Sequence, residues 1–286
     1  MFRNFSLIGL FLCFGTFTNA QITHPKSSPH AIIQQEAGLT NFIVDYSRPA
    51  VRGREIFGEL VPYGRIWRVG ANESTKLTIS QEVTIMGNKL RAGTYALYAF
   101  PKENIWEIVF HKNTSHWGDG REEYNPAEDA FRIEVSPEEI KDFQENFTIS
   151  FNEIGYESLY MDWRWAYTRI RIPIKLNTHL LMMEEIEKQL KNNPNATSFY
   201  QAARYLQEQN KQLNQSLIWL KKAETLEGSK YYISRVRSLV YASLGQYKKA
   251  INSAENSLKM SQALGKDEFV RINMYNIKKW KVKLIN

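Results

Sequence analysis

The stretch Phe147-Thr148-Ile149-Ser150-Phe151-Asn152 places an apolar side chain at every second position. Successive side chains of a β-strand point to opposite faces of a sheet, so this alternation indicates a strand with one buried face. The same period recurs at Phe131-Arg132-Ile133-Glu134-Val135 and at Arg169-Ile170-Arg171-Ile172. Thr94–Phe100 and Ile105–Phe110 are apolar on both faces, as central strands are. These runs predict about nine or ten strands in an antiparallel β-sandwich.

Two local signals interrupt the alternation. Pro173 has no N–H group to give to a sheet ladder, which predicts that the last strand is an edge or ends there. Ser136-Pro137-Glu138-Glu139 combines a capping serine, a first-turn proline and two carboxylates, which predicts the start of one short helix.

The period changes to three or four residues near Leu176, which predicts helices in the second part of the chain. Turn signals divide this part into about six helices of roughly 12 to 18 residues, antiparallel because the connections are short. The signals are Asn192-Asn193-Pro194, Gln209-Asn210-Lys211-Gln212, Gly228, Gly245 and Gly265. We therefore predict an α+β chain of two domains, with a β-sandwich over residues 21–176 and an all-α helical-repeat domain over residues 177–286.

The helical part contains an internal repeat with a constant offset between its two copies. The matched positions are Leu213, Ser216, Leu217, Leu220 and Ala223 in the first copy and Tyr247, Ala250, Ile251, Ala254 and Ser257 in the second. The offset equals the period of a tetratricopeptide repeat, and the run Gly245–Ile251 resembles the turn and second helix of such a repeat. The resemblance implies a protein partner bound through the repeats. An ordinary helical bundle is the alternative.

The N-terminus has the three regions of a secretory signal peptide. Arg3 is positive, Phe5–Phe17 is apolar and uncharged, and Thr18-Asn19-Ala20 offers a cleavage site. The apolar run is shorter than the ~20 residues of a membrane span, so we expect removal of residues 1–20 and no transmembrane span afterwards. Cys13 is the only cysteine, so the mature chain has no disulfide or thiol chemistry. We expect an exported protein of the periplasm or cell surface.

The two predicted domains differ in charge. Residues 21–176 carry 18 Lys and Arg against 21 Asp and Glu, whereas residues 177–286 carry 18 against nine. The basic run Lys278-Lys279-x-Lys281-x-Lys283 suits an anionic surface, and a solvated helix face is the simpler interpretation. Because we expect export, we expect no nucleic-acid partner.

Residues 45–75 differ from the chain around them, with five arginines between Arg48 and Arg68 among glycines and aromatic residues. Arginine offers a planar fork to carboxylate, sulfate or phosphate groups, and glycine lets the backbone approach a ligand closely. We select as ligand-binding candidates Arg54, Tyr63, Trp67, Arg68 and Asn72. The alternative is a structural crossover whose arginines, Arg48 among them, pair with internal carboxylates. The carboxylates available are Asp45, Glu55, Glu59 and Glu73.

The same segment carries a family resemblance. Its motifs are Tyr46-Ser47-Arg48-Pro49, Arg52-Gly53-Arg54, Phe57-Gly58-x-Leu60-Val61-Pro62-Tyr63-Gly64 and Trp67-Arg68-x-Gly70-Ala71-Asn72-x-x-Thr75. They resemble the signature of domain-of-unknown-function family 2911, and the likeness covers roughly residues 28–176. Family members are exported bacterial proteins, often with tetratricopeptide-like helices behind the signature domain. The resemblance implies no established activity, cofactor or catalytic residue.

A second candidate site lies in His111-x4-His116-Trp117-Gly118-Asp119, which could supply two imidazoles and a carboxylate to a metal or to acid–base chemistry. The spacing is not the i, i+4 pair of a helical zinc motif, and the glycines indicate a loop. We therefore expect a surface loop with a packed Trp117 and assign no metal and no cofactor. His116 and Asp119 are the catalytic candidates if the protein is an enzyme.

Two functions are compatible with these residues. The first is a binding or scaffold protein of the cell envelope, in which the sandwich holds a polar or anionic ligand such as a glycan or a peptide terminus. The helical repeats would then engage a protein partner. The second is a hydrolase of an envelope polymer that uses His116 and Asp119, with Arg68 or Asn72 holding the developing charge.

Overall fold

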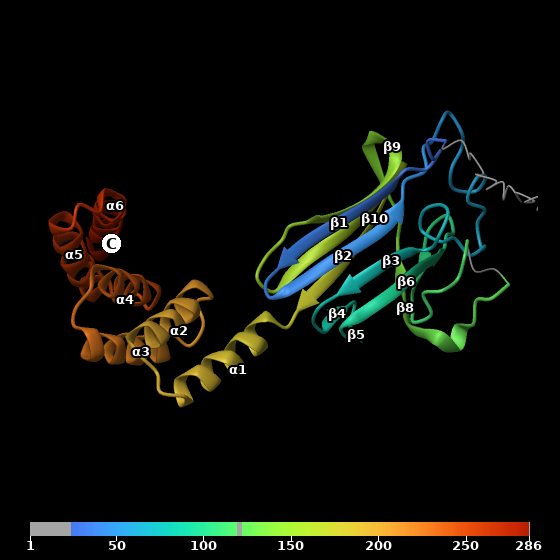
Figure 1. Ribbon diagram of the computed structural model, residues 1–286. Coiled ribbons are helices and arrows are strands. Elements are labelled where there is room, and N and C mark those ends of the chain that lie inside the picture. The colour runs from blue at the N-terminus through green and yellow to red at the C-terminus, as the bar shows by residue number, and fades with distance from the viewer. Residues whose placement is uncertain (1–23, 119–121, 286) are drawn as a thin grey trace, which may run out of the picture. The chain divides into compact units, whose positions relative to one another are not determined.

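A computed structural model describes residues 24–118 and 122–285 (Figure 1). The chain forms two compact units, and the division between them falls between Leu176 and Asn177. The predicted signal peptide and Asp119 lie outside the described residues. No helix within the described ranges is long and apolar enough to cross a bilayer.

The first unit consists of two antiparallel sheets. The six-stranded sheet has the order β1 (His30–Ala37), β2 (Thr40–Ser47), β3 (Thr75–Ile79), β6 (Gly93–Phe100), β7 (Trp106–His111) and β8 (Asp129–Val135). The four-stranded sheet has the order β5 (Asn88–Leu90), β4 (Val83–Ile85), β10 (Ser158–Leu176) and β9 (Glu138–Asn152). The prediction of an antiparallel β fold is confirmed.

The main core lies between the two sheets and is built by the alternation seen in the sequence. Phe147, Ile149 and Phe151 of β9 are buried, while the residues between them are half-buried. They belong to one buried cluster with residues of the six-stranded sheet, including Phe42, Leu77 and Ile108. Period-two patterning therefore selects the face that each strand turns to the core.

The six-stranded sheet carries a second, smaller core on its other face. Ala96, Tyr98 and Val109 are fully buried there. Ile66 and Tyr124 pack on them and belong to the long connections after β2 and β7. This explains why the sequence of β6 and β7 is apolar on both faces.

The helix predicted at Ser136-Pro137-Glu138-Glu139 is wrong. β8 ends at Val135 and β9 begins at Glu138, so Ser136 and Pro137 only connect two strands. Glu138 lies opposite Arg169 in the ladder with β10, and their side chains form an ion pair. Hydrogen bonds of the ladder pair the backbone N–H and C=O groups that a helix would have paired within itself. The contact with β10 therefore decides the structure here, although the local sequence favours a helix start.

Pro173 neither ends the last strand nor marks a sheet edge. β10 continues to Leu176 and lies between β4 and β9 in the sheet. The ladder with β9 ends at Arg169, and the ladder with β4 begins at Ile174. Pro173 therefore lies between two ladders, where its missing N–H group breaks no pairing.

The second unit contains six helices in the described part of the chain, as predicted. They are α1 (Thr178–Lys191), α2 (Ala196–Glu208), α3 (Leu213–Glu227), α4 (Tyr231–Ser243), α5 (Tyr247–Ala263) and α6 (Asp267–Ile285). α2 packs on α3, α4 on α5, and α5 on α6. α3 and α5 begin at Leu213 and Tyr247, which are the first positions of the internal repeat. The repeat thus coincides with the second helix of each of two successive hairpins.

Each unit has its own hydrophobic core. The sandwich cluster ends at Leu176, and the helical clusters begin at Ile186. We predict that residues 21–176 and residues 177–286 fold as separate fragments, because a domain with its own core retains its stability when isolated. Circular dichroism melts of the two fragments should each show one cooperative transition. Failure of both fragments to fold would mean that the two units stabilise each other.

Candidate functional site

The arginine-rich segment, residues 48–74, connects β2 to β3 and is tied to both sheets. At its start, Val51 N donates to Glu145 O (2.8 Å) and Phe147 N donates to Pro49 O (2.8 Å). Further on, Trp67 and Ala99 of β6 exchange backbone hydrogen bonds of 2.8 and 2.9 Å. The segment is therefore an ordered part of the sandwich.

Trp67 fixes the middle of this segment inside the core. Its ring is 6% exposed and stacks on Trp165 of β10, with ring centroids 6.0 Å apart and planes at 17°. Three further rings meet it edge-on, those of Phe57, Trp106 and Phe147. Its indole Nε1 donates to Gly70 O (3.2 Å). The faces of the Trp67 ring are thus occupied by core side chains. Trp67 therefore supports the site from below and does not offer a free face on which a ligand could stack.

The backbone after Trp67 turns sharply. Val69 and Asn72 have φ values of 56° and 62°, in the left-handed region that side chains rarely adopt. Gly70 has a φ of 149°, and a Cβ atom there would lie 2.8 Å from Ser47 O. This tight turn holds Arg68 and Asn72 side by side, and Arg68 Nη1 donates to Asn72 O (2.6 Å).

A cavity of about 290 Å³ opens at this turn. Four of the five ligand-binding residues selected from the sequence line it, namely Arg54, Trp67, Arg68 and Asn72. Tyr63 does not line it. The Tyr63 side chain is 41% exposed and packs over Gly58, where a Cβ atom would come within 3.1 Å of the ring. We call this space the arginine cavity.

Three arginines line the arginine cavity, Arg52, Arg54 and Arg68, and no acidic residue of the described ranges does. Their guanidinium groups bind backbone carbonyls. Arg54 donates to Val51 O (3.0 Å) and Ala50 O (2.6 Å), and Arg52 donates to Ser27 O (3.0 Å). These bonds fix the side chains and leave their charges without a counterion among the residues that the structure describes.

The alternative expectation, an internal arginine–carboxylate lattice, is not met in the described ranges. Arg48 donates instead to Phe147 O (3.1 Å) and Thr148 Oγ1 (2.6 Å) of β9. Asp45, the carboxylate nearest to it in sequence, contacts His30 Nε2 at 2.6 Å. Arg48 is therefore a link between β2 and the opposite sheet.

Asn72 is positioned by bonds that use both hydrogens of its amide. Nδ2 donates to Ser47 Oγ (3.0 Å) and to Ser28 O (3.4 Å). The oxygen Oδ1 is thus the part of the amide that is left for a ligand, and it can only accept. Asn72 suits a ligand hydroxyl or N–H group, while the arginines suit an anionic group.

The sequence analysis missed several residues of the cavity wall. Ser27 and Ser28 come from the segment before β1, and Trp165 comes from β10. No local pattern points to the serines, because only a contact between segments far apart in the sequence brings them to the cavity. Trp165 follows the alternation Leu159, Met161, Trp163, which could have marked it as inward-facing.

A larger cavity of about 660 Å³ adjoins the first and shares Ser27, Ser28 and Asn72 with it. Its charged residues are mixed in sign, namely Lys26, His30, Asp45, Glu73 and Lys76. Burial lowers the pKa of the Lys76 ammonium, and the nearby charges of Glu73 and Asp45 oppose that shift. This balanced lining does not select one sign of ligand charge.

The second candidate region is the loop after β7, which borders the larger cavity through Trp117. His116 is 6% exposed, its Nδ1 lies 3.4 Å from Tyr98 Oη, and it lines neither cavity. Asp119 falls among residues 119–121, which are not described. Trp117, expected to be packed, is 71% exposed and lines the larger cavity. The loop therefore turns the histidine inward and the tryptophan outward.

Beneath this loop, Asp129 is the centre of a polar network. Tyr124 Oη lies within hydrogen-bond distance of both oxygens of its carboxylate (3.0 and 2.8 Å), and Arg132 Nε donates to Oδ2 (2.7 Å). Burial and the hydrogen bond to Asp129 raise the pKa of the Tyr124 hydroxyl, so Tyr124 stays a donor. Burial opposes the charged form of Arg132, but Asp129 and Glu107 outweigh it and raise the pKa of Arg132.

The family model described as "Protein of unknown function (DUF2911)" matches residues 28–174. The chain belongs to this family. The matched range coincides with the sandwich and ends before α1, so it does not extend to the C-terminal helices. No curated protein and no solved structure matches the chain.

Arg48 and Arg68 should differ in their effect on stability. Arg48→Ala removes two hydrogen bonds that join residues about 100 positions apart, and hydrogen bonds of charged groups contribute about 1.5–3 kcal/mol each. Arg68→Ala removes one exposed bond within a turn, which should cost less than ~1 kcal/mol. Thermal melts should show Arg48→Ala several degrees below wild type and Arg68→Ala close to it. The reverse order would make Arg68 the structural residue.

Proposed function

We propose that the protein is an exported binding protein of the cell envelope whose sandwich holds an anionic group in the arginine cavity. The observation that carries this proposal is the lining of the cavity, with three arginines and no acidic residue in the described part of the chain. Arg52 and Arg54 are exposed and Arg68 is half-buried, so a ligand anion that enters the cavity can reach their guanidinium groups.

The chemistry of the lining favours a carboxylate, sulfate or phosphate group. Arg54 uses two of its five N–H groups internally, and Arg68 uses one, so each retains donors for a forked contact. The volume of about 290 Å³ is near the lower end for ligand cavities and fits a single charged sugar or a peptide terminus. Asn72 Oδ1 and the serines of residues 27–28 add polar contacts for hydroxyl groups.

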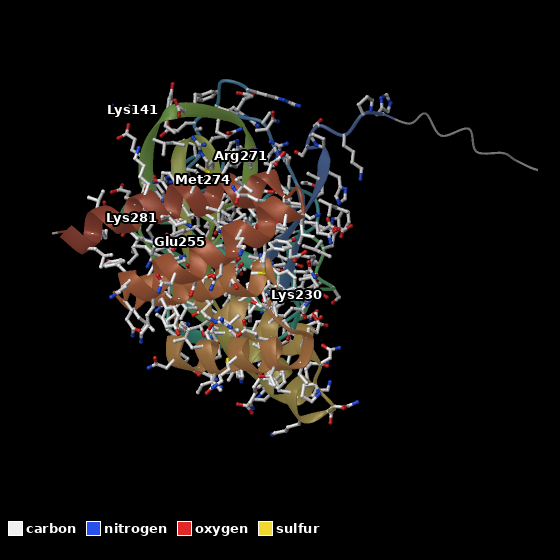
Figure 2. The ribbon with its side chains drawn as sticks, turned by 90° about the vertical axis from the view of Figure 1, so that its left-hand side faces the viewer. Lys141, Lys230, Glu255, Arg271, Met274 and Lys281 are labelled. Atoms are coloured by element: carbon white, nitrogen blue, oxygen red, sulfur yellow. The ribbon has the colours of Figure 1, made fainter. Side chains whose placement is uncertain are left out.

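We further propose that the helical unit engages an acidic protein partner. Residues 177–286 carry twice as many basic as acidic side chains. α6 exposes large apolar side chains such as Met274 (56%) beside basic ones such as Lys281, and Glu255 of α5 lies next to them (Figure 2). Glu255 and Lys281 approach to 4.0 Å across the groove between α5 and α6. A basic rim around an apolar groove suits an acidic, amphipathic segment.

The hydrolase alternative has less support. His116 lines neither the arginine cavity nor the larger cavity beside it. Arg68 and Asn72 line the arginine cavity, and His116 is not among the residues of that cavity. A general acid–base residue has to reach the bond that it cleaves, and no such arrangement supports this reading.

Export remains part of the proposal. It is supported by the positive Arg3, the apolar run Phe5–Phe17 and the cleavage motif Thr18-Asn19-Ala20. The intact mass of the protein recovered from its native envelope should correspond to a chain that lacks residues 1–20. A chain that begins at Met1 would contradict export by this route.

The ligand proposal is tested by binding of small anions to the untagged mature protein. Phosphate, sulfate and a hexuronic acid should raise the melting temperature, while the neutral sugar glucose should not. Arg68→Gln should raise the Kd of the best anion about 10- to 100-fold, because one charge-assisted contact of ~1.5–3 kcal/mol is lost. Arg65→Gln is the matched control, since Arg65 is exposed in the same segment and does not line the cavity.

Two results would contradict the proposal. One is that no anion shifts the melting temperature of the wild type. The other is that Arg65→Gln weakens binding as much as Arg68→Gln, which would indicate nonspecific attraction to a basic surface.

A further inference from the structure

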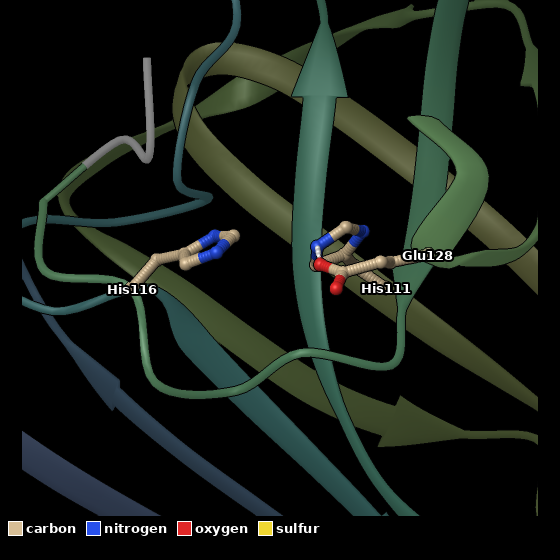
Figure 3. A group of neighbouring side chains, drawn as sticks. All are labelled: His111, His116 and Glu128. Atoms are coloured by element: carbon tan, nitrogen blue, oxygen red, sulfur yellow. Dashed lines mark ion pairs between the residues drawn. The ribbon is translucent and has the colours of Figure 1, made fainter. Parts of the chain in front are cut away.

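A compact group of three ligand-type side chains lies at the outer face of the six-stranded sheet (Figure 3). His111 is the last residue of β7, His116 follows in the loop, and Glu128 ends the short helical turn Pro126–Glu128. One nitrogen or oxygen atom from each lies within 4.8 Å of the others. Figure 3 shows the two imidazole rings and the carboxylate around one common space.

His111 is held in a state that leaves one nitrogen without a partner. Its side chain is fully buried, and Nδ1 lies 2.8 Å from Asp129 Oδ1. A carboxylate only accepts hydrogen bonds, so Nδ1 donates to Asp129, and Nε2 is the ring nitrogen that can offer its lone pair to a metal ion. Nε2 is buried, has no hydrogen-bond partner among the described residues, and faces Glu128 Oε2 at 3.4 Å. A metal ion between these two atoms would give the buried nitrogen the partner that it lacks.

The charges around this space are also unbalanced. Glu107, Glu128 and Asp129 supply three carboxylates. Arg132 is their one arginine partner in the described part of the chain, at 2.6 Å from Glu107 and 2.7 Å from Asp129. With neutral histidines, the group carries a formal charge of −2. A bound dication would neutralise it.

We propose that His111, His116 and Glu128 bind a first-row transition-metal dication, with Zn²⁺ as the best fit. Two imidazoles and one carboxylate are a ligand set that zinc adopts, whereas Mg²⁺ and Ca²⁺ prefer oxygen ligands throughout. Metal-bound histidines commonly donate their other N–H group to a carboxylate, as His111 does to Asp129. This site is independent of the anion proposed for the arginine cavity.

The distance between the ligand atoms of His111 and Glu128 already suits zinc, and the position of His116 can adjust. Ligands at ~2.0–2.1 Å from a tetrahedral ion lie about 3.3 Å apart, close to the 3.4 Å between His111 Nε2 and Glu128 Oε2. His116 is carried by the loop, so it can close the remaining gap without moving a strand. Glu128 takes the role for which the sequence pattern offered Asp119.

Metal binding at this position fixes the loop beside both cavities. Trp117 follows His116 directly and lines the larger cavity. Gly118 lies against Arg68, since a Cβ atom there would be 3.5 Å from Arg68 Nη1. The proposed metal is thus a clamp that holds one wall of the binding region in place.

Calorimetric titration of the untagged, chelator-treated protein with Zn²⁺ tests the proposal. Wild type should bind one equivalent and melt at a higher temperature when loaded, whereas Mg²⁺ should have neither effect. His116→Gln and Glu128→Gln should each raise the Kd for Zn²⁺ at least about tenfold. Both residues are outside the strands, so these variants should fold, which melting without metal verifies. Co²⁺ bound to the wild type should show the visible absorption bands of a low-coordinate ion.

His30→Gln is the matched control. His30 also contacts a carboxylate, Asp45, at 2.6 Å, but it is half exposed and has no second histidine beside it in the described residues. This variant should bind Zn²⁺ as wild type does. Absence of stoichiometric Zn²⁺ binding would overturn the proposal. Undiminished binding by both His116→Gln and Glu128→Gln would equally overturn it.

Discussion

The packing of Trp67 between the two sheets is the interaction on which the rest of the sandwich unit depends. Its backbone pairs with Ala99 of the six-stranded sheet, and its ring stacks on Trp165 of the four-stranded sheet. Trp67 thereby anchors the middle of the long crossover from β2 to β3, whose start is held by backbone bonds to β9. Because aromatic packing and backbone bonds hold the crossover, its arginines are not needed as internal ion pairs. They bind carbonyl oxygens, and their charges remain available at the surface of the arginine cavity.

The sandwich separates charges of opposite sign and leaves each group unbalanced within the described ranges. The arginine cavity has three positive residues and no acidic one there. The group around His111 has three carboxylates and one guanidinium. The loop from β7 to β8 joins the two regions, since it carries His116 on one side and places Gly118 against Arg68 on the other. The two proposed ligands, an anion in the arginine cavity and a metal dication at His111, would each balance the charge of their own group.

Features of the fold that depend on local periodicity could be predicted from the sequence. Features that depend on contacts between distant segments mostly could not. The alternation of Phe147, Ile149 and Phe151 and the repeat that relates Leu213 to Tyr247 appear directly as a buried strand face and as equivalent helices. The helix predicted at Ser136-Pro137-Glu138-Glu139 is wrong because the local sequence does not show that Glu138 pairs with Arg169. Residue types marked Arg54, Trp67, Arg68 and Asn72 as one cluster, whereas Tyr63 shows that proximity in sequence does not place a side chain in a cavity. Glu128 and Asp129 carried no signal, because only the ladder between β7 and β8 brings them to His111.

The central claim is that the crossover separates structural from ligand-facing arginines, and NMR of the arginine side chains tests it most directly. The ¹⁵N–¹H signals of Nε–H groups can be assigned with single Arg→Lys variants and followed while phosphate is added. Our account predicts saturable shifts for Arg54 and Arg68, which line the cavity, and unchanged signals for Arg48 and Arg65. Shifts of equal size for all four, or for Arg48 alone, would contradict it.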